Sequence, residues 1–156
     1  ILKNTLQSIG LKANIMSAIN IDKICNPYMP TKAIECLQRK EIVIVAAGTG
    51  NPFFTTDTAA VLRAVEMKCD FLLKGTQVDG VYSKDPKKHQ DAVRFDRVSY
   101  EYLITNNLDV MDITSLVLAR DNKLAIKVFP IASKGAFAKT LTNQGKFTLI
   151  SKDEQP

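Results

Sequence analysis

Short apolar runs alternate with segments of helical pattern along this chain. The apolar runs cover residues 13–19, 42–47, 71–73, 126–129 and 147–150. The second of them is apolar throughout instead of alternating with polar residues, a pattern typical of a strand buried on both faces of a parallel sheet. The runs therefore predict strands, and this one is expected to lie deepest in the core.

Between these runs, apolar residues recur at helical spacing, and a side chain able to cap a helix precedes each segment. The candidate caps are Thr31, Thr56 or Asp57, Ser99, Asp112 and Ser133. Strands that alternate with helices in this way predict an α/β fold, in which a mostly parallel sheet lies between helix layers and the crossovers are right-handed.

The length of 156 residues suits one domain, which is predicted to span residues 1–156. Residues 1–9 carry apolar side chains at positions 1, 2, 6 and 9, and Gly10 follows them. This pattern is typical of the last turns of a helix that ends at a glycine. We expect that the helix begins before Ile1 and that the fold is incomplete at its N-terminus.

Composition narrows the class of protein but not its ligand. Hydrophobic residues make up 46% and charged residues 24%, which is ordinary for a globular protein and argues against disorder, collagen or a disulfide scaffold. The three cysteines form no CxxC pair, so neither zinc nor redox chemistry is expected and a reducing compartment is favoured. A net charge of +5 favours anionic partners, among which it does not discriminate.

The first segment with candidate chemistry is residues 46–57, Ala-Ala-Gly-Thr-Gly-Asn-Pro-Phe-Phe-Thr-Thr-Asp. It leaves the carboxyl end of a predicted strand, where open α/β sheets bind ligands. Gly48 and Gly50 allow close approach of the backbone, and Thr55 and Thr56 lie where a helix N-terminus favours a phosphate. The same residues are also common in a plain connecting turn.

Phe53 and Phe54 have two interpretations. Their rings can cover a nucleotide base or sugar, or they can be ordinary core residues. The pattern leaves both open.

The second segment is residues 74–86, which contains the turn Asp79-Gly80. Here Tyr82 can stack on a base and Asp85 can accept hydrogen bonds from ribose hydroxyls or an amino group. An exposed β-turn explains the pattern equally well. The irregular stretch that follows, 83–98, is long enough to suggest a mobile cover.

Other motifs are weaker. Asp112 is interpreted as a helix cap rather than a catalytic acid, Arg120 as a surface or interface residue, and His89, the one histidine, as a surface residue. The sequence has no GxxxxGK[ST] loop and no protein-kinase catalytic loop, which argues against both classes of kinase. No metal site is predicted.

The run from Gly48 to Asp57 resembles the UMP-binding signature of bacterial-type uridylate kinases, members of the amino-acid-kinase superfamily. Residues 74–86 resemble the ATP-binding loop of that family, residues 111–121 resemble its late helix, and the likeness extends from Gly10 to Ile150. It implies the amino-acid-kinase fold and transfer of the γ-phosphoryl group of ATP to UMP, giving UDP and ADP in pyrimidine nucleotide biosynthesis.

The resemblance also assigns roles to residues. Asp57 would lie near the reacting phosphates as the catalytic residue. Eight residues would hold UMP: Thr49, Gly50, Asn51, Pro52, Phe53, Phe54, Thr55 and Thr56. Three would hold ATP: Thr76, Tyr82 and Asp85. It further implies magnesium, a homohexamer, activation by GTP, inhibition by UTP and a cytoplasmic or plastid location, with no membrane or nucleic-acid partner.

The sequence departs from the family in places. The family supplies a lysine and a glycine-rich phosphate loop from its first strand, and residues 1–9 match neither, so a polypeptide of these 156 residues alone is expected to be nearly inactive. Gly75 and Gln77 stand where the family usually has Ala and Lys, and 133–135 read Ser-Lys-Gly in place of Lys-Pro-Gly.

Three alternatives remain. One is another enzyme of the same fold that acts on glutamate, aspartate or carbamate, which residues 51–57 argue against because those relatives differ there. The others are a non-catalytic regulatory or nucleic-acid-binding relative, which the basic pI of about 9.1 permits, and a degenerate product without activity.

Overall fold

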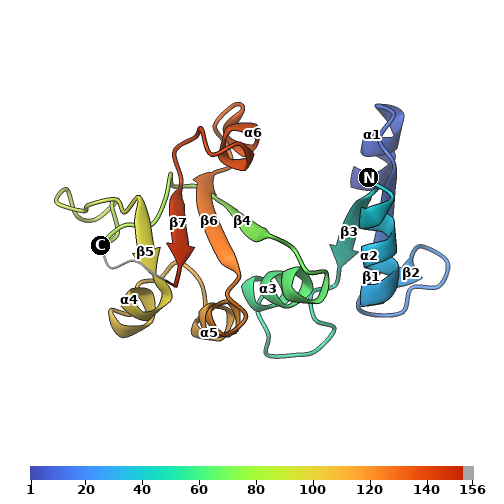
Figure 1. The fold of residues 1–156 in the computed structure, drawn as a ribbon, viewed down its shortest axis with the longest axis horizontal. Helices are drawn as coiled ribbons and strands as arrows, with labels where there is room; N and C mark the ends of the chain where they lie inside the picture. Colours follow the sequence, from blue (N-terminus) through green and yellow to red (C-terminus); the bar gives the residue numbers. More distant parts are fainter. Residues whose placement is uncertain (153–156) are drawn as a thin grey trace. The chain divides into compact units, whose positions relative to one another are not determined.

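The computed structural model describes residues 1–152, which form two compact units. The first is Ile1–Lys68, and the second begins at Cys69. Each has its own sheet, and each is described by itself below (Figure 1).

The first unit holds a three-stranded, all-parallel sheet in the order β2-β1-β3. β1 and β3 pair over their full length, from Ala13 opposite Ile42 to Ser17 opposite Ala46. A small core of Met16, Ala33 and Cys36 joins the sheet to α2. The elements are α1 (Leu2–Ser8), β1 (Ala13–Ser17), β2 (Asn26–Pro27), α2 (Pro30–Gln38), β3 (Ile42–Ala46) and α3 (Thr56–Glu66).

The prediction that the strand after residue 42 is buried on both faces is wrong within this unit. Ile42 is 38% exposed, and the other four residues of β3 are only half-buried. β3 lies at the edge of the sheet, with β1 on one side. A continuous apolar run predicts a strand, but it does not tell whether the strand has neighbours on both sides or lies at the edge of the sheet.

Two predicted helix caps are confirmed and three are wrong. Ser99 Oγ accepts a hydrogen bond from Tyr102 N–H at 3.1 Å, and Asp112 Oδ1 accepts one from Ser115 N–H at 3.0 Å. Both satisfy a first-turn amide that has no partner within its helix. The interpretation of Asp112 as a cap is therefore correct.

The other three helices begin differently. α2 begins at Pro30, one residue before Thr31, because a proline lacks the N–H that a cap would satisfy. α3 has Thr55 as its cap, not Thr56 or Asp57. α6 follows Gly135, whose φ of 75° lies in the left-handed region, and Ser133 does not act as its side-chain cap.

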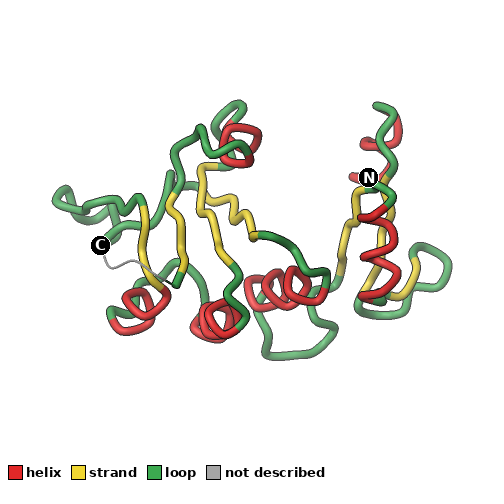
Figure 2. The backbone as a smooth tube through the Cα atoms, in the orientation of Figure 1, coloured by secondary structure: helices red, strands yellow, loops and turns green. Residues whose placement is uncertain are grey.

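The second unit holds a four-stranded sheet in the order β4-β6-β7-β5, and its strands lie side by side in Figure 2. β4 pairs with β6 and β5 with β7 in parallel, whereas β6 and β7 are antiparallel. The predicted α/β fold with mostly parallel strands is thus confirmed. The elements are β4 (Phe71–Thr76), β5 (Arg97–Ser99), α4 (Tyr100–Thr105), α5 (Ile113–Asp121), β6 (Ala125–Pro130), α6 (Ala136–Leu141) and β7 (Thr148–Ser151).

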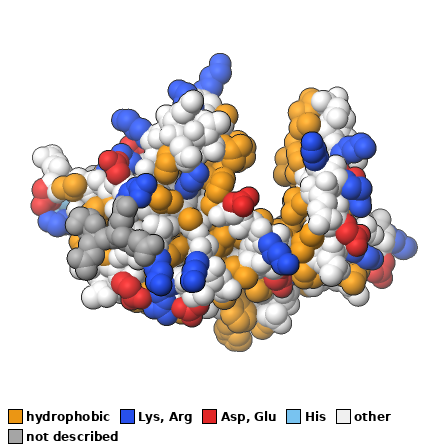
Figure 3. Space-filling model, in the orientation of Figure 1, with side chains coloured by type: hydrophobic (Ala, Val, Ile, Leu, Met, Phe, Trp, Pro, Cys, Tyr) orange, Lys and Arg blue, Asp and Glu red, His pale blue; other side chains and the backbone are white. Residues whose placement is uncertain are grey.

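Charged side chains of both signs are dispersed over the face shown in Figure 3, with hydrophobic side chains between them. No helix in the described part of the chain is long and apolar enough to cross a membrane.

The core of the second unit makes its stability sensitive to alkaline pH. Tyr100 is 1% exposed and donates its hydroxyl proton to the Leu124 carbonyl, and burial raises the pKa of Tyr100 to about 12. The folded state therefore holds this proton more tightly than the unfolded state does. Stability from this group is complete below pH ~10 and is lost as the pH rises toward 12, by on the order of 1.4 kcal/mol per pH unit.

Urea unfolding of the wild type and of Tyr100→Phe, at pH 9 and at pH 11, tests this. At pH 9 the variant is expected to be less stable than the wild type, because the Leu124 carbonyl loses its donor. Between pH 9 and pH 11 its free energy of unfolding should fall by less than that of the wild type, because phenylalanine has no proton to release. An unchanged pH slope in the variant would show that the tyrosine does not carry the effect.

Candidate functional site

The loop from β3 to α3 has an unusual backbone. Ala47, Gly48, Gly50 and Phe53 have φ angles of 63°, 60°, 77° and 68°. A left-handed conformation costs a residue with a side chain roughly 1–2 kcal/mol, and such residues cluster at functional sites. The loop is therefore held in one shape by its surroundings, and its two glycines relieve part of that cost.

The tip of this loop is tied by side-chain hydrogen bonds and carries two exposed rings. Asn51 N–H donates to Thr49 Oγ1 at 3.1 Å, and Asn51 Nδ2 donates to the Thr49 carbonyl at 3.4 Å. Phe53 is 103% exposed and Phe54 53% exposed. The interpretation of the two phenylalanines as core residues is therefore wrong, and both rings are accessible to a ligand.

The loop ends at the N-terminus of α3, an eleven-residue helix. Thr55 Oγ1 accepts a hydrogen bond from Thr58 N–H at 3.1 Å, which fixes the first turn. Asp57 lies in that turn, where a carboxylate is favourable because of the helix dipole. Thr55, Thr56 and Asp57 thus lie together, beside the amides that favour a phosphate.

The Arg63 side chain on α3 binds the backbone of this loop. It is 12% exposed, and its Nη2 donates to the Gly48 carbonyl at 3.0 Å. Nη1 donates to Glu66 Oε2 at 2.8 Å, and the guanidinium carbon lies 4.0 Å from the centre of the Tyr28 ring. The Tyr28 hydroxyl donates to the same Glu66 oxygen at 2.9 Å. One cation therefore connects the loop, α3 and the residue after β2.

Sequence reasoning missed this arrangement. Arg63 comes four residues after the buried Ala59 and three before Glu66, which places it on the inner side of α3 next to a carboxylate. That spacing is the signal that could have identified it, but Tyr28 and Gly48 are too distant in sequence to be paired with it by pattern.

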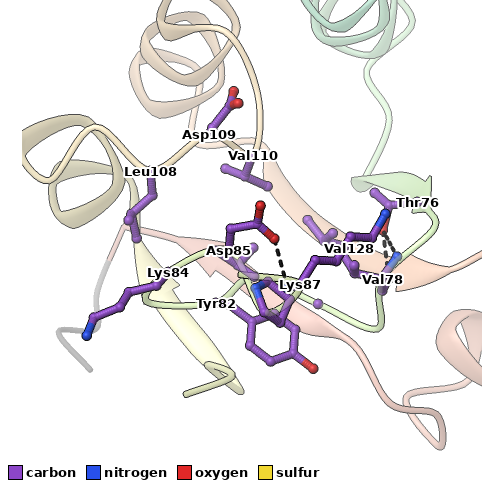
Figure 4. A pocket seen from close by; sticks show the side chains of 13 residues that line it. Thr76, Val78, Tyr82, Lys84, Asp85, Lys87, Leu108, Asp109, Val110 and Val128 are labelled. Carbon is purple, nitrogen blue, oxygen red and sulfur yellow. Dashed lines mark hydrogen bonds between the residues drawn. The ribbon is translucent and has the colours of Figure 1, made fainter. Parts of the chain in front are cut away.

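A pocket of about 400 Å³ lies in the second unit. As Figure 4 shows, it is bounded by Thr76 at the end of β4 and by Val78 just after it, by the loop with Tyr82 and Asp85, and by the turn at Leu108–Val110. Thr76, Tyr82 and Asp85, the residues predicted to hold ATP, therefore lie around one cavity. The turn between α4 and α5 completes it and was not predicted.

Local contacts fix the three predicted residues. Thr76 Oγ1 donates to the Val78 carbonyl at 2.7 Å, and the Tyr82 hydroxyl donates to Asp79 Oδ1 at 2.6 Å, which raises the pKa of Tyr82. Asp85 Oδ1 accepts from Lys87 N–H at 2.9 Å. That bond, together with the nearby Lys88 ammonium, lowers the pKa of the Asp85 carboxyl. Asp85 is therefore an ionised acceptor at neutral pH.

The stretch 83–98 is anchored at its base. Ser83 N–H donates to the Val93 carbonyl at 2.9 Å, and Phe95 N–H donates to the Val81 carbonyl at 2.9 Å. His89, in the same stretch, is exposed, as predicted. The two ends of the stretch thus stay together, and the predicted role of its outer part as a cover stays a prediction.

The amino acid kinase family model matches residues 1–130 of this sequence. The chain belongs to the amino acid kinase family. Among its relatives, the uridylate kinases of Paramagnetospirillum magneticum and Rickettsia felis are 51% and 50% identical to it, over 97% and 96% of its length. The chain spans 63% and 62% of the length of these two curated relatives.

Solved structures agree with this assignment. The crystal structures of UMP kinase from Ureaplasma parvum and from Bacillus anthracis match the chain with TM-scores of 0.93 and 0.94, each at 34% identity. The matches cover 97% and 98% of this chain, and 65% and 64% of those chains. The amino-acid-kinase fold predicted from the sequence is confirmed, and so is the resemblance to uridylate kinases.

Removing the side-chain cap of α3 should lower the stability of the first unit. Thr55→Ala is expected to lower the free energy of unfolding by about 1 kcal/mol, because the Thr58 amide loses its acceptor. Thr55→Ser keeps the oxygen and should retain most of that stability. Urea unfolding of the three proteins measures this, and equal losses in the alanine and serine variants would contradict the capping role.

Proposed function

We propose that this chain is the nucleotide-recognising part of a uridylate kinase, which transfers the γ-phosphoryl group of ATP to UMP. The observation that carries the proposal is the loop at 47–57, whose glycines, exposed rings and capped helix start form one surface after β3. Sequence identities of 51% and 50% to two uridylate kinases support the proposal. We infer that both units belong to one domain.

On the acceptor side, the two exposed phenylalanine rings would cover the base and sugar of UMP. Its phosphate would lie at the start of α3, near Thr55 and Thr56, because the N-terminus of a helix favours an anion. Thr49 to Asn51 would complete the surface, with Gly50 allowing the backbone to approach the ligand. Asp57 would lie near the reacting phosphates.

On the donor side, the pocket beside β4 would hold ATP. Its volume of about 400 Å³ lies within the ordinary range for small-molecule sites. The Tyr82 ring would stack on the base, and the Asp85 carboxylate would accept from a hydroxyl or amino group. Magnesium would arrive with the ATP phosphates, which it commonly coordinates in such sites. Among residues 1–152 no group of three or more His, Cys, Asp and Glu side chains could hold a metal.

Phosphoryl transfer needs mainly positioning and charge compensation from a protein. The contribution of these residues is to hold the acceptor phosphate at a helix start and to fix the donor through its nucleoside. Compensation of charge at the γ-phosphate falls to magnesium and to the phosphate loop that the resemblance assigns to the first strand of the family.

The test is UDP formation from UMP and ATP with magnesium, with CMP as the control acceptor. UDP with little CDP supports the proposal. A polypeptide restricted to the 156 residues is expected to bind UMP in calorimetry while it turns over poorly, because charge compensation is incomplete. A chain that binds neither nucleotide would overturn the proposal.

A variant separates the two nucleotide sites. Asp85→Asn keeps the shape of the side chain but replaces one acceptor oxygen with a donor, so we expect ATP affinity to fall about tenfold while UMP affinity is unchanged. Asp121→Asn, at an ion pair with Arg120 whose two partners both lie outside the pocket lining, is the matched control and should leave both affinities unchanged. Calorimetric titration with each nucleotide measures this.

The remaining properties rest on the same resemblance. We propose a homohexamer, activation by GTP, inhibition by UTP, a place in pyrimidine nucleotide biosynthesis and a cytoplasmic location. Sedimentation velocity and the UDP assay with added GTP or UTP test the first three.

A further inference from the structure

Lys127 is buried in the middle of an otherwise apolar strand. It lies on β6 between Ile126 and Val128 and is 7% exposed. Lysines are almost never this buried unless an opposite charge accompanies them, because an ammonium loses its hydration. Among the described residues no carboxylate lies within 4.0 Å of its Nζ, since the ion pairs that the structure records do not include it.

What surrounds the ammonium is polarisable but uncharged. Nζ donates to Asn143 Oδ1 at 2.8 Å, and it lies 4.0 Å from the centre of the Phe71 ring and 5.6 Å from that of Phe147. The ring faces attract a cation, and the amide uses one of its three protons. Within the described part of the chain, no carboxylate forms an ion pair with this ammonium.

This ammonium faces a second cavity, of about 780 Å³. Four cationic side chains and one carboxylate line it, so the lining has a net charge of three positive. Arg94 is anchored at the cavity by Nη1, which donates to the Phe147 carbonyl at 3.1 Å, and by a salt bridge to Asp96. Lys146 stands exposed at the rim. A cavity of this size and charge suits an anion with more than one negative charge.

The cavity lies on the opposite face of the sheet from the pocket beside β4. Successive side chains of a strand point to opposite faces, and Val128 lines the first pocket whereas Lys127 lines the second. The register places Arg97, Leu149 and Lys127 in one row across β5, β7 and β6, all of them lining the second cavity. The two sites are therefore separated by the sheet itself.

We propose that this second cavity, called here the Lys127 cavity, binds a phosphate-bearing anion. Lys127 would supply the buried charge, Arg94 and Lys146 would contact the outer phosphate oxygens, and Asn143 would orient the ammonium. The bound anion would be the counterion that Lys127 lacks among residues 1–152. This inference is independent of the proposed kinase activity, because it uses none of the residues assigned to UMP or ATP.

The probe is inorganic pyrophosphate without magnesium, titrated into the isotope-labelled full chain and followed by the backbone amide signals in two-dimensional NMR. We expect saturable shifts at Asn143, Gly145 and Phe147. Signals of Tyr82 and Asp109 report the pocket beside β4 and separate the two sites. The absence of shifts around the Lys127 cavity at millimolar pyrophosphate would overturn the proposal.

Three substitutions assign the effect. Lys127→Met keeps the length of the side chain and its contact with the rings, and should weaken pyrophosphate binding at least about tenfold, as expected for losing a charge-assisted hydrogen bond. Lys146→Met, at the exposed rim, should weaken it several-fold and does not threaten the fold. Lys134→Met makes the same charge change at an exposed position outside the cavity and is the control.

If Lys134→Met weakens pyrophosphate binding as much as Lys146→Met does, the effect is one of general charge and the site is refuted.

Titration with a nucleoside triphosphate distinguishes two sources of the phosphate group. Tighter binding than pyrophosphate, with shifts that extend to Phe71, would identify a nucleotide as the ligand. Equal affinity would identify the polyphosphate group as all that the cavity recognises.

Discussion

Replacing Arg63 by methionine is expected to destabilise the first unit by about 2–4 kcal/mol. This is somewhat less than the roughly 3–5 kcal/mol for a fully buried ion pair, because the Glu66 side chain is 27% exposed. The loss leaves Glu66 with the Tyr28 hydroxyl as its remaining recorded partner and leaves the Gly48 carbonyl without this donor. Methionine fills a similar volume, so the loss reflects charge and hydrogen bonds more than a cavity.

The same variant should weaken UMP binding at least about tenfold under conditions in which it remains folded, since the Gly48 carbonyl is one of the few contacts that fix a strained loop. Arg63 is not among the residues proposed to contact UMP, so we expect it to act as a positioning residue. Urea unfolding gives the first quantity and calorimetric titration with UMP gives the second.

Arg39→Met is the matched control. It removes the same kind of side chain and an ion pair of similar length in the same unit, 3.1 Å from Nε to Glu41 Oε1, but the Arg39 side chain is 56% exposed. Solvent screens the exposed guanidinium, and Glu41 keeps the Asn14 side-chain amide as a donor, so the loss should be clearly smaller than that of Arg63→Met. Equal destabilisation by the two substitutions would show that the Arg63 contacts carry no special role, and unchanged UMP affinity in Arg63→Met would refute positioning.

Arg63→Lys refines the interpretation. Lysine keeps the charge beside Glu66 but cannot reach two acceptors with a planar fork. We expect it to recover part of the stability through Glu66, but not the contact with Gly48. If the variant recovers UMP affinity in full, charge alone positions the loop.

The alternation of strands and helices was readable from the sequence because it depends on local patterns. Short apolar runs predicted β1, β3, β4, β6 and β7, and the caps at Ser99 and Asp112 followed from one side chain and its neighbouring amides. The start of α3 was less determinate, because Thr55, Thr56 and Asp57 are all able to cap a helix. Only the geometry chooses among such adjacent residues.

Features that depend on distant pairs were not readable. The pocket beside β4 is completed by Leu108–Val110, and Lys74 Nζ donates to the Val110 carbonyl at 2.7 Å across 36 positions of sequence. The packing of the elements also determines two other contacts: the hydrogen bond from Arg63 to the Gly48 carbonyl, and the position of Lys127 over the Phe71 ring. The sequence pattern shows that a charged residue interrupts an apolar run, but it does not show which groups contact that residue in the fold.

Gly50→Ala is expected to be the other large loss, about 2–5 kcal/mol, because two costs add. A residue with a side chain at φ of +77° costs roughly 1–2 kcal/mol. In addition, the new Cβ would lie 2.9 Å from the Ala18 carbonyl oxygen and 3.3 Å from the Ala18 Cβ. A backbone oxygen cannot swing away as a flexible side chain does, so overpacking adds about 1–3 kcal/mol.

Relief of this clash requires that the loop or the segment after β1 moves. Because Gly50 lies between Thr49 and Asn51 at the tip of the loop, UMP affinity should fall at least about tenfold together with stability. Urea unfolding at neutral pH and calorimetric titration with UMP measure the two effects on the same protein.

Gly48→Ala and Gly10→Ala separate backbone strain from steric overlap. Gly48 lies in the same loop at φ of +60°, where a new Cβ would make only ordinary contact, 3.7 Å from the Ala59 Cβ. Gly10 has φ of +83° and nothing within 4 Å of such an atom. Both controls carry the strain without the overlap and should cost about 1–2 kcal/mol. If Gly50→Ala costs no more than they do, the close approach to Ala18 is not what requires glycine, and backbone conformation alone explains its presence there.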